Sequence, residues 1–408
     1  MDWVKLLSSW VALSLLAGCC VAGGAQSSAG FEFRFTEKPG PDAVGLKVLP
    51  EYDRTRVFQT EGTDKAGGSG GPRPIQIVEW YPAEASAGKK MTLGDYAELV
   101  KTETSFEKPV ERGKSQDFVA QYMHGTETQA RLAVRDAAGR AGRFPVVVYA
   151  PSLNAPAIEN IELCEYLASW GYVVMASPSM GAAGREMTVD VGGANGEAKD
   201  ISFLVDVAGR LAETDASEVA VMGYSWGGMG ALFAAARDKR VGALVSLDGS
   251  FRYSPRTVVE AGDVHPEAMT IPLLVFSRAE ETLESWAAMR QDPAAAPSVL
   301  NEWTHGEVVH VRMLAMSHIQ FSTIYQRSER FRKQGVQFDP ADYSPEEGAE
   351  SYNWVARYTR EFLDAALKHD ADGMAFLKRT PAENGVPRHL MAVSYRAGTA
   401  AASPTEGR

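Results

Sequence analysis

The chain of 408 residues is 45% hydrophobic and 23% charged, a composition typical of a globular protein with a large buried core. Its formal net charge is −11 at pH 7. Because a protein with this charge repels polyanions on average, we expect neither nucleic acid nor a polyanionic substrate as a partner.

The first 25 residues have the features of an export signal. Lys5 precedes an apolar stretch, residues 6–16, that is too short to span a bilayer reliably. Leu16-Ala17-Gly18-Cys19 resembles the bacterial lipobox, in which the cysteine is lipidated and becomes the new N-terminus, whereas Gly23-Gly24-Ala25 would suit ordinary signal peptidase. We favour the lipobox and expect a lipoprotein on the periplasmic side of a bacterial cell envelope, tethered to the membrane through Cys19. A secreted protein is the alternative.

Residues 26–142 are expected to be an N-terminal portion of the same domain that follows them. Two apolar stretches, 44–49 and 74–81, predict antiparallel strands that extend the edge of a sheet. The stretch 83–143 is polar and helix-leaning, and the sequence leaves open whether this insertion caps a functional site or packs against the sheet.

Strand and helix patterns alternate from residue 143 to 370, which is typical of an α/β fold with a mostly parallel sheet and helices on both faces. Strands are predicted at 144–150, 172–176, 218–222, 241–247, 271–276 and 308–314. Helices are predicted at 160–169, 199–211 and 352–369. Residues 371–408 are expected to be a C-terminal extension, partly disordered.

The most informative motif is Gly223-Tyr224-Ser225-Trp226-Gly227, which joins a predicted buried strand to a predicted helix. A serine on a sharp turn in this setting is called a nucleophile elbow. A Cβ atom at either outer glycine would collide with neighbouring backbone, and the Trp226 amide, at the start of the helix, can donate to an oxyanion. A glycine-rich turn with an unrelated serine is the alternative, but the strand-turn-helix setting favours Ser225 as a nucleophile.

A serine hydroxyl needs a general base, and in this kind of fold the chain order is serine, acid, histidine. His318 follows the last predicted strand, where a loop can return over the elbow. His310 lies inside that strand and His305 in a polar turn, while His265 comes early in the order and His369 ends a helix. We therefore predict His318 as the base.

Two positions are plausible for the acid. Asp248 ends the strand that follows the elbow unit, and Glu280 and Glu281 follow the next strand. Both positions lie at the carboxyl edge of a parallel sheet, where functional groups concentrate in open α/β sheets.

These residues resemble a known family. Gly223-Tyr-Ser-Trp-Gly-Gly, then Leu247-Asp248-Gly249, then Ser317-His318-Ile-Gln-Phe are similar to the α/β-hydrolases of the platelet-activating-factor acetylhydrolase and dienelactone-hydrolase-like group, as is Trp80-Tyr81-Pro82 at the end of an early strand. In the acetylhydrolase branch the acid follows the strand after the elbow, which favours Asp248. In dienelactone hydrolases it comes one strand later, which keeps Glu280 and Glu281 open, although those enzymes use a cysteine nucleophile.

The resemblance also implies a second oxyanion donor in the loop after the first central strand, where the family usually has His-Gly and an apolar residue. Here the loop reads Ala150-Pro151-Ser152-Leu153-Asn154. The backbone amide of Leu153 matches the donor position. Pro151 lacks an N–H and stiffens the loop, so the geometry of this half of the oxyanion hole depends on what holds it.

The expected function is a serine hydrolase that cleaves carboxylic esters through an acyl-enzyme intermediate, with a short-chain lipid ester, a lactone or an aryl ester as its small-molecule substrate. No metal or organic cofactor is implied, because the chain has neither metal-ligand spacing nor a Gly-x-Gly-x-x-Gly phosphate loop. A peptidase or amidase on the same fold and a non-catalytic, membrane-tethered binding protein are the alternatives. The sequence predicts no oligomeric state.

Overall fold

The computed structural model describes residues 32–59, 70–106, 123, 125–278, 297–327 and 342–399. The predicted export signal with Cys19 and the alternative acids Glu280 and Glu281 lie outside the described residues. Over the described ranges, no helix combines the length and the hydropathy that crossing a membrane requires.

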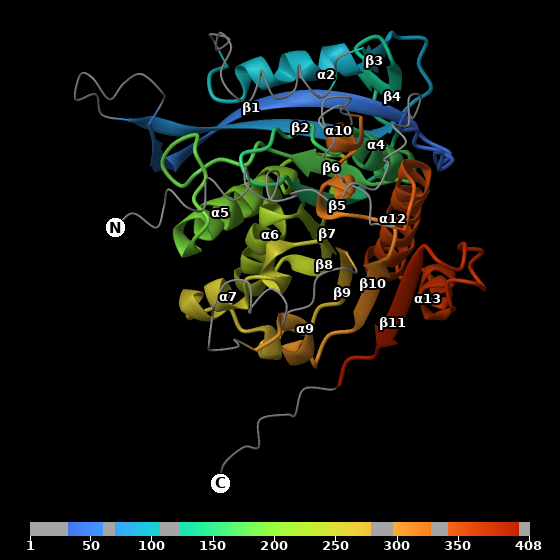
Figure 1. Ribbon diagram of the computed structural model, residues 1–408. Coiled ribbons are helices and arrows are strands. Elements are labelled where there is room, and N and C mark those ends of the chain that lie inside the picture. The colour runs from blue at the N-terminus through green and yellow to red at the C-terminus, as the bar shows by residue number, and fades with distance from the viewer. Residues whose placement is uncertain are drawn as a thin grey trace, which may run out of the picture.

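A single mixed sheet organises the part of the chain that the structure describes (Figure 1). Its 11 strands follow one another in the order β11-β10-β9-β8-β7-β5-β6-β2-β1-β4-β3. Their bounds are β1 Ala43–Phe58, β2 Gly71–Ala83, β3 Lys90–Thr92, β4 Ala130–Arg135, β5 Phe144–Ala150, β6 Val173–Ala176, β7 Thr214–Tyr224, β8 Val241–Leu247, β9 Leu273–Arg278, β10 Val308–Met313 and β11 Met391–Arg396. The strands from β6 to β10 in this order run parallel, so their carboxyl ends meet along one edge.

Helices cover both faces of the parallel strands, as the sequence predicts. Helices α4 and α12 pack into the core on one face, and α5, α6 and α7 pack into the core on the other (Figure 1). The helices are α2 Leu93–Leu99, α4 Ile161–Ser169, α5 Val191–Ala208, α6 Trp226–Arg237, α7 Pro255–Ala261, α9 Val299–Glu302, α10 Thr323–Gln326, α12 Pro345–Leu367 and α13 Ala371–Lys378, with short 3-10 turns η1 Val100–Thr102, η2 Ser250–Arg252, η3 Pro266–Ala268 and η4 His318–Phe321. Strands buried on both sides explain why β5, β6, β8 and β9 read as nearly continuous apolar runs.

Two helices begin earlier than predicted. Helix α5 starts at Val191 rather than residue 199, because the Asp190 side chain accepts from the Gly193 amide at 2.8 Å and caps a glycine-rich first turn whose composition does not favour a helix. Helix α12 starts at Pro345 rather than residue 352. Ser344 and Glu347 form a capping box around a proline at the first helical position, a start pattern that the prediction did not use.

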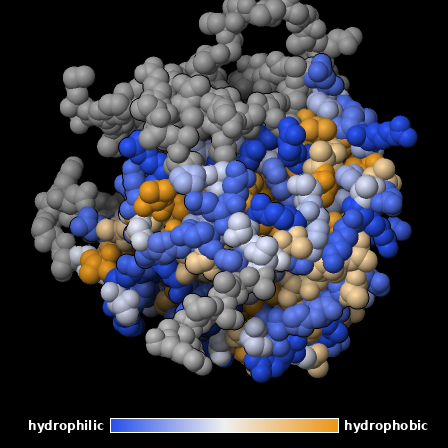
Figure 2. All heavy atoms as spheres, turned by 90° about the horizontal axis from the view of Figure 1, so that it is seen from below, coloured by the Kyte–Doolittle hydropathy of each residue, from blue (hydrophilic) through white to orange (hydrophobic). Residues whose placement is uncertain are grey.

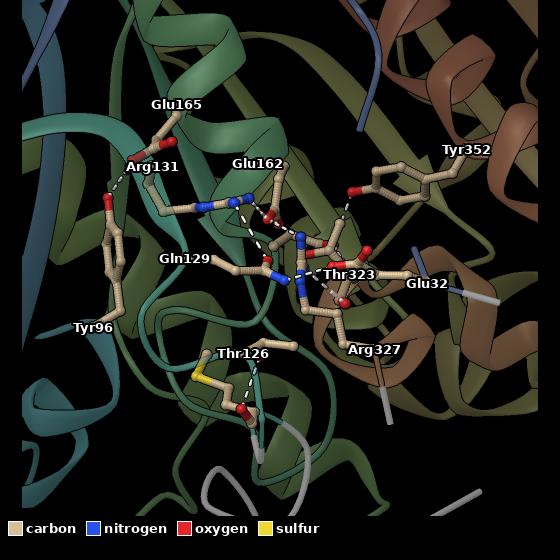
Figure 3. A network of polar contacts seen from close by, with 12 residues as sticks. Glu32, Tyr96, Thr126, Gln129, Arg131, Glu162, Glu165, Thr323, Arg327 and Tyr352 are labelled. Carbon is tan, nitrogen blue, oxygen red and sulfur yellow. Dashed lines mark hydrogen bonds and ion pairs between the residues drawn. The ribbon is translucent and has the colours of Figure 1, made fainter. Parts of the chain in front are cut away.

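The N-terminal portion joins the same sheet through β2, which pairs antiparallel with β6 on one side and with β1 on the other. The stretch 83–143 supplies β3, α2, η1 and β4, and buried ion pairs fasten it to the core (Figure 3). Glu162 of α4 is 2.7 Å from Arg131 of β4 and also pairs with Arg327. The insertion therefore packs against the core helix α4.

Beyond α12 the chain adds elements that the sequence did not predict. Helix α13 packs beside α12, and β11 pairs antiparallel with β10 at the edge of the sheet. Figure 2 views the molecule from below and shows mostly polar residues with small apolar groups between them. Few large hydrophobic side chains are exposed within the described residues: Tyr52 and Val57 lie on β1, Val259 lies on α7, and Val189 lies just before α5.

Candidate active site

Ser225 occupies the turn between β7 and α6. Its backbone has φ 54° and ψ −119°, a strained conformation for a residue with a side chain. A Cβ on Gly223 would lie 2.3 Å from the Gly227 carbonyl oxygen, and one on Gly227 would lie 2.2 Å from the Ala150 carbonyl oxygen. The two glycines are thus required by close backbone contact, and the turn presents Ser225 at the carboxyl edge of the sheet.

Three side chains from distant parts of the chain form one hydrogen-bonded line. Ser225 Oγ lies 2.8 Å from His318 Nε2, and His318 Nδ1 lies 2.6 Å from Asp248 Oδ2. Asp248 is completely buried, whereas the His318 side chain is 32% exposed. In this arrangement the imidazole can take the serine proton while the carboxylate stabilises the imidazolium that forms.

Asp248 follows β8 and has a positive φ of 46° before Gly249. Its Oδ1 accepts from the Tyr253 hydroxyl and from the Arg278 amide at 3.2 Å, and its Oδ2 lies 3.3 Å from Arg278 Nη1. Burial alone would raise the pKa of the Asp248 carboxyl, but the Arg278 guanidinium and the hydrogen bonds from His318 and Tyr253 hold that pKa well below its usual range. The carboxylate therefore stays ionised beside His318 at neutral pH.

His318 opens the short turn η4 after β10, and the turn is fixed at both ends. Ser317 and Gln320 form a capping box in which the Ser317 amide donates to Gln320 Oε1 at 2.6 Å. The Tyr224 hydroxyl donates to the His318 carbonyl at 2.9 Å. Tyr224 precedes Ser225 directly, so the residue before the nucleophile also holds the backbone of the histidine.

The loop that carries Leu153 follows β5 and lies against the elbow. Ala150 pairs with Gly223 in the β5–β7 register, and the carbonyl oxygens of Ala150 and Pro151 are the backbone atoms that a side chain on Gly227 would strike. Trp226 is the first residue of α6, so its amide has no acceptor within the helix. The amides of Leu153 and Trp226 thus belong to two segments in direct contact beside Ser225.

No protein-family model and no curated protein sequence matches this chain. Among solved structures, a ferulic acid esterase from Streptomyces cinnamoneus is similar with a TM-score of 0.61 and 20% sequence identity, over 88% of this chain and 98% of that one. This chain has the α/β-hydrolase fold. The predicted fold class is confirmed, while the narrower acetylhydrolase and dienelactone-hydrolase-like group stays a prediction.

In this α/β-hydrolase fold the other histidines weighed for the base lie away from Ser225. His310, in β10, is 2.8 Å from Ser277 Oγ, and burial lowers its pKa to about 4. His265 pairs with Glu267 at 3.1 Å. His305 contacts the Thr399 carbonyl and His369 contacts Glu218. Of the described histidines after Ser225, His318 is the one that reaches its hydroxyl.

The site also contains side chains whose contacts the sequence did not predict. From the sequence, Tyr253 is expected only to line an apolar pocket or to pack, like Trp226, Met180 and Phe251, and all four are buried. Arg278 ends β9, next to the strand that carries Asp248. A cation at the carboxyl end of a neighbouring strand was the available signal, but it requires knowing that β8 and β9 are adjacent.

Within the described part of the chain, no group of His, Cys, Asp and Glu side chains is arranged to hold a metal ion. The site itself contains a strained serine, an imidazole and an ionised buried carboxylate.

Proposed function

We propose that this protein is a serine hydrolase that cleaves carboxylic esters through an acyl-enzyme intermediate. The observation that carries the proposal is the continuous line from Ser225 through His318 to Asp248, with contacts of 2.8 and 2.6 Å, placed on a nucleophile elbow. The fold and the ester-hydrolysing activity named for its structural neighbour support the same reaction class.

In the proposed reaction, Ser225 Oγ attacks the ester carbonyl carbon while its proton passes to His318 Nε2. The carbonyl oxygen becomes an oxyanion and receives hydrogen bonds from the Leu153 and Trp226 amides. The intermediate collapses by breaking the bond to the alcohol, which takes the proton from His318. Water then attacks the acyl group, gives its proton to His318, and the acid leaves as Ser225 regains a proton.

We infer an uncharged or singly charged substrate with an apolar acyl group: a short-chain lipid ester, a lactone or an aryl ester. Esters of ferulic acid, whose acyl group is aromatic, join these candidates because the structural neighbour is a ferulic acid esterase. The acetylhydrolase and dienelactone-hydrolase-like group remains our proposal for the closer relationship. We also propose export and lipidation at Cys19, which the mass of the mature N-terminus would test.

The proposal is tested by turnover of a p-nitrophenyl ester series of increasing acyl length, with methyl ferulate and matched p-nitroanilides beside it. We expect ester turnover that Ser225→Ala abolishes. Turnover of anilides without esters would make the protein an amidase. Absence of both would favour the binding protein and contradict the proposal.

A further inference from the structure

Glu159 is a completely buried carboxylate between the loop after β5 and the start of α4. Its Oε2 accepts from the Ser152 amide at 2.8 Å and from the Tyr149 hydroxyl at 3.0 Å, and its Oε1 accepts from the Ser152 hydroxyl at 2.5 Å. All three donors belong to β5 and the loop that carries the Leu153 amide. Glu159 therefore takes up both donors of the residue directly before Leu153.

The next residue connects this loop to the segment that carries the histidine. Asn160 Nδ2 donates to the Tyr149 hydroxyl at 2.8 Å and to the Phe321 carbonyl at 3.1 Å, while its Oδ1 accepts from the Thr323 amide at 3.0 Å. The Tyr149 hydroxyl thus receives from Asn160 and donates to Glu159. A continuous hydrogen-bonded chain runs from Ser152 to the end of the turn that begins at His318.

We propose that Glu159 is a positioning residue for the oxyanion hole, which orients the Leu153 amide through Ser152 and keeps this loop in register with the His318 turn. The inference rests on the function proposed above. An oxyanion hole is effective only when its donors are fixed before the reaction, since the gain comes from dipoles that need no reorganisation. Pro151 offers no N–H to hold the loop from the other side.

The chain provides a matched control. Glu165, on helix α4, is also buried and also accepts three hydrogen bonds, from the amides of Leu132 and Ala133 and from the Tyr96 hydroxyl. Figure 3 shows Glu165 and Tyr96 together on the side of the insertion. Loss of Glu165 therefore costs similar buried contacts, but these hold β4 rather than the loops of the site.

The test compares Glu159→Ala, Glu159→Gln, Ser152→Ala and Glu165→Ala on p-nitrophenyl butyrate, with active sites counted by a fluorophosphonate. For Glu159→Ala we expect kcat per active site to fall about 10- to 100-fold with KM within twofold, since removing an oxyanion donor outright costs about 100- to 1000-fold. Affinity for a trifluoromethyl ketone inhibitor should fall by a similar factor. Glutamine preserves the shape and can bond Ser152 and Tyr149, so Glu159→Gln should stay within about threefold of the unmutated protein.

Ser152→Ala keeps the hydrogen bond from the amide of residue 152 to Glu159 and should lower kcat about three- to tenfold. This variant tests the role of Glu159 if Glu159→Ala does not fold. The control Glu165→Ala should change stability but not kcat per active site. The inference is overturned if kcat per active site is unchanged in Glu159→Ala or Ser152→Ala, or falls equally in Glu165→Ala. Failure of the unmutated protein to turn over esters or react with the fluorophosphonate would instead overturn the proposed function, and the inference with it.

Discussion

Arg278 Nη1 lies 3.3 Å from Asp248 Oδ2, the same oxygen that forms the hydrogen bond with His318 Nδ1. The guanidinium and the imidazole therefore share one carboxylate oxygen. Arg278 ensures that the buried carboxylate is ionised, and the remaining negative charge is available to the imidazolium when it forms. This shared contact leads to two predictions about the acid.

Replacing Asp248 with asparagine should lower kcat by about 10⁴-fold, because an amide can hold the wrong tautomer of the imidazole and cannot stabilise its charge. The control is Glu281→Gln, which removes one of the alternative acids. We expect this control to keep activity within about twofold. Loss of activity in Glu281→Gln with retention in Asp248→Asn would move the acid one strand later. Steady-state rates on one ester decide between them.

Replacing Arg278 with methionine should destabilise the fold by on the order of 3 kcal/mol, because it leaves a buried carboxylate without its cation. The second replacement, Asp248→Asn in the same chain, should recover part of that loss. Urea unfolding of the two single variants and the double variant measures this coupling. Strictly additive losses would show that the pair does not interact.

Gly227→Ala should abolish activity and lower stability, since its Cβ would lie 2.2 Å from the Ala150 carbonyl oxygen and force the elbow away from the loop that carries Leu153. A matched control is Gly242→Ala in β8, where the nearest atom to a Cβ is 3.5 Å away. Thermal unfolding and ester turnover of the two variants should differ sharply. Normal activity in Gly227→Ala would contradict the described contact.

Stability should fall as pH rises from about 4.5 to 8. Burial raises the pKa of Glu197 to about 8, and that of four other glutamates to about 7: Glu79, Glu103, Glu159 and Glu165. Each of these carboxyls has a higher pKa in the folded protein than in the unfolded chain. Between the two pKa values the unfolded chain has lost the proton and the folded protein still holds it, so the free energy of unfolding falls as pH rises through this range. The pKa of His310 is lowered from 6.5 to about 4, so its contribution to stability rises with pH between these two values and is constant above them.

The free energy of unfolding, measured by urea at steps from pH 5 to 8, checks this sign. The decline should be clearest above pH 6.5, where His310 no longer opposes it. Glu197→Gln should flatten the decline, while Glu98→Gln, an exposed change on α2, should not. Stability that rises over this window would show that these carboxyls are ionised and satisfied in the fold.

The sequence predicts the site best where the signal is contiguous. Ser225 is recognisable because the five residues of the motif impose the turn, and His318 follows from chain order and strand ends. Those two criteria leave Asp248, Glu280 and Glu281 open for the acid, and the family resemblance favours Asp248. Arg278 and Tyr253 could not be assigned in this way, because their contacts depend on which strands lie side by side. Strand β11 had a readable signal, since larger apolar residues alternate with small or polar ones over Met391–Arg396, but the alternation is short and follows a stretch without other strands.

The most direct test of Ser225 as the nucleophile is to find the residue that a fluorophosphonate modifies, by reacting the purified protein and mapping the adduct by mass spectrometry of its peptides. We expect one adduct per chain, on Ser225, formed quickly in the unmutated protein, slowly in His318→Ala and not at all in Ser225→Ala. An adduct on another serine, or labelling that does not depend on His318, would contradict this role of Ser225.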